Sequence, residues 1–338
     1  MTFLEQAWYK KAGWLILLWP LAFLFQILAG VRRSLQQVKS RPPELTVPVV
    51  VIGNISAGGT GKTPLLIALT QQLKAEGFSP GVISRGYGGQ GANYPMQVSA
   101  SENPAIAGDE PVLIARKTDC PVVIDPDRSA ALNYLLETNN VDVVLSDDGL
   151  QHYKLYRDIE VAVVDGQRLF GNGLCLPAGP LREPVKRLMN SDFVVLNGAA
   201  ESALPILEPA VQMTMEPKIL VNLATGEKRP FGGAPFNMGN KIQVVSGIGN
   251  PKRFYNVLEK LPYPIMPMAF PDHHQFSESD FQSDEFDEHQ PVVMTEKDAI
   301  KCESFAKNNF WYLQAEVSLP DSFLEEFTKK LKSFISTM

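Results

Sequence analysis

Apolar positions along the middle of the chain fall into short consecutive runs that alternate with stretches of helical spacing. The runs are rich in β-branched residues and end in glycine or polar turns; they cover 47–54, 80–86, 120–124, 141–149, 159–166 and 191–198. Runs without polar alternation are typical of strands buried on both faces. They therefore predict an α/β fold, a mostly parallel sheet with helices on both faces, and ligands at the carboxyl ends of its strands.

A second set of such runs lies nearer the end of the chain, at 241–250, 290–298 and 310–317. A stretch rich in proline and glycine, 228–239, precedes it. Such stretches separate independently packed units more often than they lie inside one. We therefore expect a larger core over 41–227 and a smaller C-terminal α/β domain over 228–338 that closes a cleft.

The first forty residues follow a different pattern. From 12 to 31 the chain carries no charge, and Lys10-Lys11 and Arg32-Arg33 flank this run. As a helix it would be about 30 Å long, enough to reach across the hydrocarbon layer or to lie embedded in it. A signal peptide is the competing interpretation, but no small-residue cleavage site precedes Arg32. Residues 1–40 thus predict a membrane-associated helix and linker, and leave open whether the helix spans or embeds.

Composition narrows the class of protein. The 338 residues are 45% hydrophobic and 20% charged, the balance of a folded protein. The net charge of -6 gives no general attraction for nucleic acid, so we expect none as a partner. Cys120, Cys175 and Cys302 are far apart, so neither a disulfide framework nor a zinc site is indicated. No obligate protein partner is evident either.

The first candidate for chemistry follows the run 47–54. Eight residues lead from that strand into an apolar helix: Ser56, Ala57, Gly58, Gly59, Thr60, Gly61, Lys62 and Thr63. Glycines let backbone N–H groups converge on phosphates, the lysine reaches the β- and γ-phosphates, and the threonine hydroxyl can hold Mg²⁺. Ser56 stands where the strict pattern has glycine. The segment predicts a phosphate-binding loop for ATP.

Two adjacent acids, Asp147 and Asp148, end the apolar run 141–149. A carboxylate at this point of a nucleotide-binding sheet holds Mg²⁺ directly or through water. The competing interpretation is a turn that closes the strand, which Asp-Gly favours. Spacing does not decide which of the two acids is the ligand.

A kinase also needs a group that receives the proton of the acceptor hydroxyl. Asp109 and Glu110 stand at a predicted helix start, where acids also serve as caps. The loop 271–276 supplies a second candidate, with Asp272, His273 and His274 in succession. Arginines in other loops, Arg85, Arg128, Arg182 and Arg187, could meet an anionic substrate.

Eight motifs in this order resemble a known family: GNISAGGTGKTP, SRGYGG, AGDEP, DPDR, SDDGLQH, LPAGPLREP, FPDHHQF and MTEKDAIK. Behind an N-terminal apolar helix they resemble the tetraacyldisaccharide 4'-kinases, the lipid A kinases of Gram-negative bacteria. The resemblance extends to about Lys301. It implies transfer of the ATP γ-phosphate to the 4'-hydroxyl of a membrane-embedded, tetraacylated glucosamine disaccharide 1-phosphate, giving lipid IVA. It also implies a two-domain fold and a site at the cytoplasmic face of the inner membrane.

The family's functional residues carry over by position. Ser56 to Thr63 match its phosphate loop, so Ser56 is no departure within the family. Asp109 matches the catalytic base and His273 its paired histidine, with His274 still possible; Asp147 and Asp148 match the metal-site acids. Contacts of Arg85, Tyr87, Glu110 and Arg182 with the nucleotide or the lipid phosphate are further hypotheses. Since Asp109 and His273 belong to different domains, we expect domain closure to assemble them.

Two other classes of protein use similar loops. A membrane-associated regulatory ATPase of the cell-division and partitioning type carries a lysine before the paired glycines, where this chain has Ala57. Its membrane element is usually C-terminal and amphipathic. A small GTPase would carry an Asn-Lys-x-Asp motif, for which Asn197-Gly198 is a poor substitute. The sequence favours the kinase.

Overall fold

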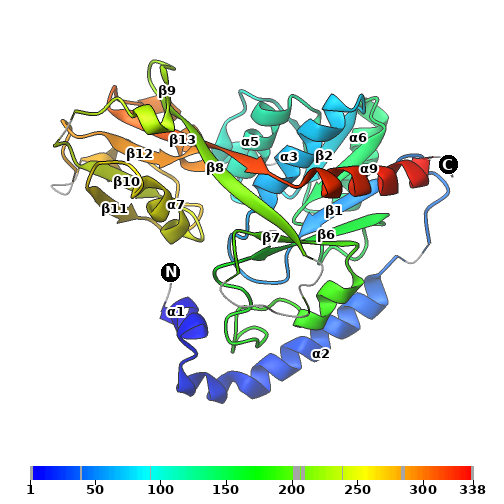
Figure 1. The fold of residues 1–338 in the computed structure, drawn as a ribbon. Helices are drawn as coiled ribbons and strands as arrows, with labels where there is room; N and C mark the ends of the chain where they lie inside the picture. Colours follow the sequence, from blue (N-terminus) through cyan, green and yellow to red (C-terminus); the bar gives the residue numbers. More distant parts are fainter. Residues whose placement is uncertain are drawn as a thin grey trace.

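The computed structural model describes residues 3–38, 40–91, 93–200, 206, 210–237, 239–282 and 286–335. It places a core sheet and a smaller sheet side by side, with the N-terminal helices beneath the core in the view of Figure 1. One long strand, β8, runs through both sheets. The predicted α/β class and mostly parallel sheet are confirmed.

The core sheet has the order β8-β7-β6-β1-β5-β2-β4-β3. Adjacent strands are parallel except for β3, which runs antiparallel to β4 at the edge. The strands are β1 (Val49–Gly53), β2 (Pro80–Ser84), β3 (Met96–Val98), β4 (Val122–Ile124), β5 (Val143–Asp147), β6 (Ile159–Asp165), β7 (Phe193–Asn197) and β8 (Val211–Asn222).

Helices cover both faces of this sheet, which explains its unbroken apolar runs. Side chains of β1 alternate between two cores: Val50 and Ile52 belong to one, Val49 and Val51 to the other, and all four are fully buried. The helices are α3 (Lys62–Ala75), α4 (Pro104–Ala107), α5 (Asp109–Thr118), α6 (Arg128–Thr138) and α9 (Asp321–Ile335), with the 3₁₀ helix η2 (Val185–Asn190). Helices α3, α5 and α9 pack on the first core, and α6 on the second.

The smaller sheet has the order β11-β10-β12-β13-β8, with β9 paired to β8. Its strands are β9 (Lys228–Pro230), β10 (Ile242–Ser246), β11 (Ile265–Ala269), β12 (Val292–Thr295) and β13 (Phe310–Ser318). Helices α7 (Pro251–Leu258) and α8 (Glu296–Cys302) accompany it, with the 3₁₀ helices η4 (Phe231–Gly233), η5 (Glu278–Phe281) and η6 (Glu303–Phe305).

The two units are not separated by the single boundary at 227/228 that we expected from the sequence. The first residues of β8 pair with β7 in the core, and residues 214–222 pair with β13 in the smaller sheet. After β13 the chain returns to the core, where Phe323 and Phe327 of α9 lie against Phe193, with ring centroids 5.3 and 6.0 Å away. The smaller domain is thus inserted between β8 and α9, because the apolar face of α9 completes a core face.

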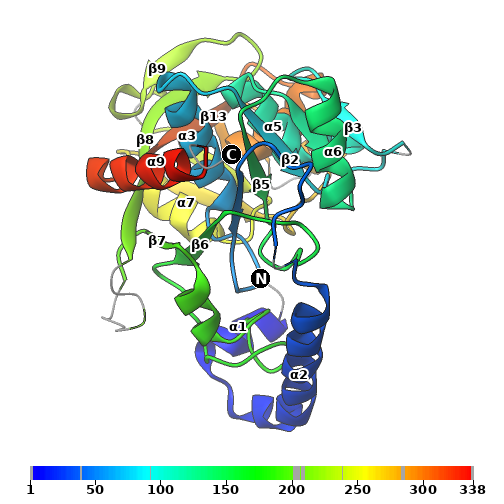
Figure 2. The same ribbon diagram turned by 90° about the vertical axis from the view of Figure 1, so that its right-hand side faces the viewer.

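The N-terminal segment forms α1 (Phe3–Lys10), the 3₁₀ helix η1 (Gly13–Leu18) and α2 (Trp19–Gln36). By length and composition, Gly13–Gln36 could cross a membrane: it has 24 residues, and its most apolar 18 residues have a mean hydropathy of 2.1 and are only 11% buried. Pro20 lies at the start of α2, where no backbone hydrogen bond is lost, so it does not interrupt the helix. Figure 2 shows α1 and α2 projecting below the core.

Helix α1 is tied to the core of the molecule. The Trp8 indole is buried and donates to the carbonyl oxygen of Pro177 at 3.0 Å. Trp8 and Leu15 form a small apolar cluster against which Ala57 of the predicted phosphate loop packs. The membrane-type segment is therefore held next to that loop.

Candidate active site

The segment from Ser56 to Thr63 forms a tight loop between β1 and α3. Gly58 and Gly61 adopt φ angles of 91° and 95°, a region that favours glycine. A Cβ atom at Gly61 would also collide with the side-chain amide of Asn197. Within the loop, Asn54 donates from Nδ2 to Thr60 Oγ1 at 3.1 Å. The glycines are therefore required by the backbone and by its close neighbours.

Residues far away in the sequence fix this loop from outside. Asn197 donates from Nδ2 to the carbonyl oxygen of Thr60 at 2.9 Å, and Ala57 N–H donates to the carbonyl oxygen of Pro180 at 2.7 Å. The guanidinium of Arg168 donates to the carbonyl oxygen of Gly59. The bonds of Asn197 and Arg168 occupy the carbonyl groups of Thr60 and Gly59, which turns neighbouring backbone N–H groups toward the site of a phosphate. The bond of Ala57 instead anchors the start of the loop.

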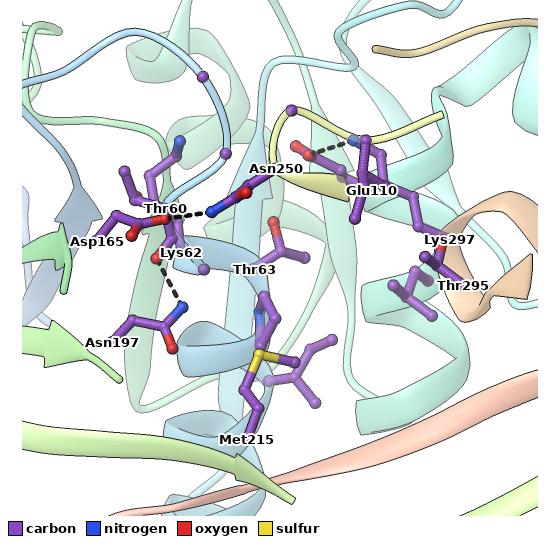
Figure 3. A pocket seen from close by; sticks show the side chains of 18 of the residues that line it. Thr60, Lys62, Thr63, Glu110, Asp165, Asn197, Met215, Asn250, Thr295 and Lys297 are labelled. Atoms are coloured by element: carbon purple, nitrogen blue, oxygen red, sulfur yellow. Dashed lines mark hydrogen bonds and ion pairs between the residues drawn. The ribbon is translucent and has the colours of Figure 1, made fainter. Parts of the chain in front are cut away.

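A cleft of about 1320 Å³ lies in front of the loop, between the core and the smaller domain. Most of the predicted site residues line it: Gly58, Gly59, Thr60, Gly61, Lys62, Thr63, Arg85, Tyr87, Glu110, Asp147, Asp148, Arg182 and His273. Figure 3 shows Lys62 and Thr63 on one side of the cavity, with Glu110 and Lys297 on the other. Ser56, Ala57 and Asp109 lie behind this lining.

The two acids at the end of β5 have different surroundings. Asp148 is 3.6 Å from Lys62 Nζ and 3.2 Å from a guanidinium nitrogen of Arg182. Burial alone would raise the pKa of Asp148, but these two cations outweigh it and lower the pKa. Asp147 is only 2% exposed, and its Oδ1 has no hydrogen-bond partner. Burial, with the charges of Glu110 and Asp148, raises the pKa of Asp147 to about 7.

This pair of acids fits a magnesium ion. Mg²⁺ at a nucleotide is usually held by one or two carboxylates together with phosphate oxygens and water. The buried, unpartnered oxygen of Asp147 and the Thr63 hydroxyl, both facing the cleft, are donors of that kind. In the described residues, no group of three or more His, Cys, Asp or Glu side chains is placed to hold a metal. The phosphates would therefore have to complete the coordination.

The predicted acid and histidine meet on the opposite side of the cleft. His273 Nδ1 lies 3.3 Å from Asp109 Oδ1, although the residues are 164 positions apart. Asp109 begins α5 and is only 3% exposed, whereas His273 lines the cleft. His273 has a φ of 59°, and the edge of its ring meets that of Tyr87 with centroids 4.7 Å apart. Asp109 is thus reached from the cleft by way of His273.

Two lysines of α8 complete the surroundings of Asp109. Lys297 Nζ and Lys301 Nζ lie 3.8 and 3.7 Å from Asp109 Oδ2. Burial alone would raise the pKa of Asp109, but the His273 hydrogen bond and the two ammonium groups lower the pKa to about 2. The carboxyl group is therefore ionised at neutral pH.

The neighbouring histidine takes no part in this arrangement. His274 Nε2 lies 3.2 Å from Asp280 Oδ2, and its ring packs between Phe270 and Phe276. The left-handed backbone at His273 separates the directions of the two side chains. Of the two candidates that the sequence leaves open, only His273 is placed beside Asp109.

The Asp109–His273 pair is already formed in the structure, where we expected domain closure to assemble it. Helices α5 and α8 pack against each other across the two domains. Lys117 and Glu296 form an ion pair of 2.6 Å in this contact, and Arg116 pairs with Glu303. The packing of α5 against α8 therefore forms this side of the cleft and connects the two domains.

Several residues of the cleft escaped the sequence analysis. Asp165, at the end of β6, accepts from Asn250 Nδ2 at 3.0 Å and lies 3.3 Å from the guanidinium groups of Arg168 and Arg253. Asn197 ends β7 in the same way. Both residues stand at strand carboxyl ends, which is the one signal in the sequence that could have found them.

The chain is similar to proteins of known family. It matches the family model described as LpxK, tetraacyldisaccharide-1-P 4'-kinase, over residues 14–332. The tetraacyldisaccharide 4'-kinase of Nitrosococcus oceani is 48% identical over 317 residues, 94% of this chain and 90% of the relative. That of Hahella chejuensis is 43% identical over 342 residues, 99% of this chain and 98% of the relative.

A solved structure agrees with these relatives. The crystal structure of LpxK from Aquifex aeolicus in complex with ATP superposes with a TM-score of 0.73 at 30% identity, over 95% of this chain and 99% of that one. The resemblance predicted from the order of the motifs is therefore confirmed. This chain belongs to the tetraacyldisaccharide 4'-kinase family of enzymes.

Proposed function

We propose that this chain transfers the γ-phosphate of ATP to the 4'-hydroxyl of a tetraacylated glucosamine disaccharide 1-phosphate, forming lipid IVA. One observation carries the proposal: the phosphate loop and the Asp109–His273 pair face each other across a single cleft. That arrangement provides for a phosphate donor and for a hydroxyl acceptor at once. The family membership favours this activity over that of a regulatory ATPase.

Residues on the two sides of the cleft have different roles in the reaction. Lys62 and the N–H groups of the loop hold the phosphates of ATP. Thr63 and Asp147 would hold Mg²⁺, which neutralises phosphate charge when bound. Asp148, engaged with Lys62 and Arg182, orients these two cations. Arg85, Tyr87 and Glu110 remain candidates for contact with the acceptor.

The Asp109–His273 pair accepts the proton of the acceptor hydroxyl. The sugar oxygen forms a bond to the γ-phosphorus while the bond between that phosphorus and the bridging oxygen of ADP breaks. The leaving ADP keeps the electron pair of the broken bond, and the hydroxyl proton passes to the pair. Asp109 is ionised and able to accept it.

The N-terminal segment suits a substrate that resides in a membrane. Apolar side chains are exposed along η1 and α2, among them Leu17, Phe23 and Leu28. We propose that this surface lies in the cytoplasmic face of the bacterial inner membrane and anchors the enzyme beside its lipid substrate. The contact of α1 with Ala57 then keeps the phosphate loop close to that surface.

Incubation of the purified protein in detergent with radiolabelled ATP, Mg²⁺ and the tetraacylated disaccharide 1-phosphate tests the activity. We expect a labelled lipid. Asp109→Ala should lose turnover but keep ATP affinity, whereas Lys62→Ala should weaken both. ATP hydrolysis without labelled lipid would contradict the proposal, and equal loss of ATP affinity in the Asp109 variant would reduce Asp109 to a helix cap.

A further inference from the structure

Lys297, near the start of α8, lies among acceptors of the cleft wall and has no role in the proposal above. Its Nζ is 2.9 Å from Glu110 Oε1, 3.4 Å from His273 Nε2 and 3.8 Å from Asp109 Oδ2. Asp272 Oδ1 lies 3.9 Å away. The side chain is mostly buried, with 16% of it exposed. Burial favours the neutral amine, but the three acids outweigh burial and raise the pKa of Lys297.

The two ring nitrogens of His273 face partners of opposite kind. Nδ1 faces the ionised carboxylate of Asp109, which can only accept a hydrogen bond. Nε2 lies 3.4 Å from the ammonium group of Lys297, which can only donate one, and 3.9 Å from Asp272 Oδ1, which is beyond hydrogen-bond distance. Both contacts are satisfied by one form of the imidazole alone, the neutral tautomer with its proton on Nδ1.

We propose that Lys297 is a positioning residue that holds His273 in this neutral tautomer, directs its Nδ1–H to Asp109, and so prepares the pair to accept a single proton. The inference rests on the proposed kinase activity, in which that proton comes from the acceptor hydroxyl. With Lys297 donating to Nε2, that nitrogen keeps its lone pair and Nδ1–H stays directed at the ionised carboxylate of Asp109 until the acceptor binds. The acceptor hydroxyl then takes the place of the ammonium group at Nε2 and gives its proton to that nitrogen.

The charges around Asp109 agree with this assignment. His273 approaches from the loop after β11, Lys297 and Lys301 approach from α8, and Glu110 follows on α5 itself. Lys301 is also 2.9 Å from Asp298, so the cation on that side is shared between two acids. Lys297 is the cation that touches both Asp109 and the imidazole.

A purely structural role for Lys297 would be to join α8 to α5 through Glu110. The ion pair of Lys117 with Glu296 joins the same two helices at 2.6 Å and supplies a matched control. Lys117→Met removes one ion pair of the contact and leaves Lys297 in place. Lys297→Met removes the ion pairs with Glu110, Asp109 and Asp272 together with the donor to His273. Only the second change should alter the imidazole.

Nitrogen NMR of the full-length protein, labelled at histidine, measures the tautomer directly. The chain has four histidines, and His273→Gln assigns the relevant signals. We expect the wild-type spectrum to show a protonated Nδ1 and an unprotonated Nε2. A protonated Nε2 in the wild type would overturn the proposal whatever the variants do. Lys297→Met should give a mixture of tautomers, while Lys297→Arg and Lys117→Met keep the wild-type form; unchanged His273 signals in Lys297→Met would also overturn it.

Kinetics of double variants separate action through His273 from general loss of structure. Lys297→Met should lower kcat on the order of tenfold with little change in the KM for ATP, and Lys297→Arg should restore most of it. In a His273→Ala background, Lys297→Met should lower kcat by less than about twofold, because the imidazole on which Lys297 acts is absent. An equal loss in both backgrounds would show a structural role. Absence of labelled lipid from the wild type would instead refute the kinase activity, and the NMR result would still decide the role of Lys297.

Discussion

Asn197, the last residue of β7, donates to the carbonyl oxygen of Thr60 at 2.9 Å and so fixes the phosphate loop from two strands away. The C=O and N–H groups of a trans peptide point in opposite directions. Anchoring the Thr60 carbonyl therefore turns the N–H of Gly61 the other way. Through its bond to a loop carbonyl, the Asn197 side chain can therefore set the direction of a phosphate-binding group.

Asn197→Asp should test this relationship, because a carboxylate cannot donate to the carbonyl. We expect the KM for ATP to rise on the order of tenfold, equivalent to the loss of about 1.4 kcal/mol. Asn222→Asp is the matched control, since Asn222 Nδ2 donates to the Asn308 carbonyl at 2.7 Å in the smaller domain. Both variants lose a bond of the same kind. An equal effect of both on the KM for ATP would contradict the prediction.

The two acids after β5 should respond differently to amide substitution. Asp147→Asn should raise the Mg²⁺ concentration for half-maximal activity on the order of tenfold or more, because a metal ligand is weakened. Asp148→Asn should leave that concentration unchanged and lower turnover through Lys62 and Arg182. Titration with Mn²⁺ by electron spin resonance checks the affinity independently of activity. Equal shifts in both variants would contradict the assignment of Asp147 as the main ligand.

Asp109 should make the stability of the protein depend on pH in the acid range. Its pKa of about 2 lies below its ordinary 3.8, so ionised Asp109 stabilises the folded state. That contribution is present above pH 4 and is lost as the pH falls toward 2. The difference in free energy of unfolding between wild type and Asp109→Asn should therefore shrink by about 2 kcal/mol over this range.

Urea denaturation followed by tryptophan fluorescence measures this difference. Glu288→Gln serves as the control, because the side chain of Glu288 is 79% exposed. Its difference from the wild type should stay small and nearly constant with pH. A constant difference for Asp109→Asn would show that Asp109 has no depressed pKa in the folded protein.

Charges on the exposed face of α2 should release the protein from membranes. Phe23 and Leu28 are 66% and 59% exposed. A charged side chain at the centre of a membrane helix costs about 3 kcal/mol, so Phe23→Glu with Leu28→Glu should abolish most vesicle binding. Flotation with vesicles of bacterial phospholipid measures it. Gln36→Glu, at the end of α2, should float as the wild type does; flotation of the double variant would refute the anchor.

Most of the buried strands could be predicted from the sequence, because each appears there as a short run of apolar residues. Every residue of β1 and β5 is buried, and polar residues enter these strands only at the end of β5, at Ser146 and Asp147. The pattern missed β3, β8, β9 and β11. Polar and apolar residues are mixed along β8, which joins the two sheets, and β3 and β11 lie at opposite edges. Pro267 within β11 argues against a strand, yet an edge strand tolerates it. Edge strands carry weaker patterns since one side needs no partner.

Some parts of the site could be predicted from the sequence, and others could not. The phosphate loop and the acids after β5 are local features that one stretch of sequence displays. Lys297 pairs with Glu110 from 187 positions away; it belongs to the motif MTEKDAIK, but that motif does not by itself assign it a partner. His273 and His274 are equivalent in sequence, and only a positive φ at His273 separates them. These contacts depend on α5 packing against α8, which local patterns do not encode.

The return of α9 to the core has a consequence for synthesis. Phe323, Phe327 and Leu331 complete a core face whose strands were made far earlier. A chain emerging from the ribosome therefore holds an incomplete core until its last residues are released, while its apolar first helix is already exposed. The proposed membrane contact of that helix would therefore precede the completion of the core.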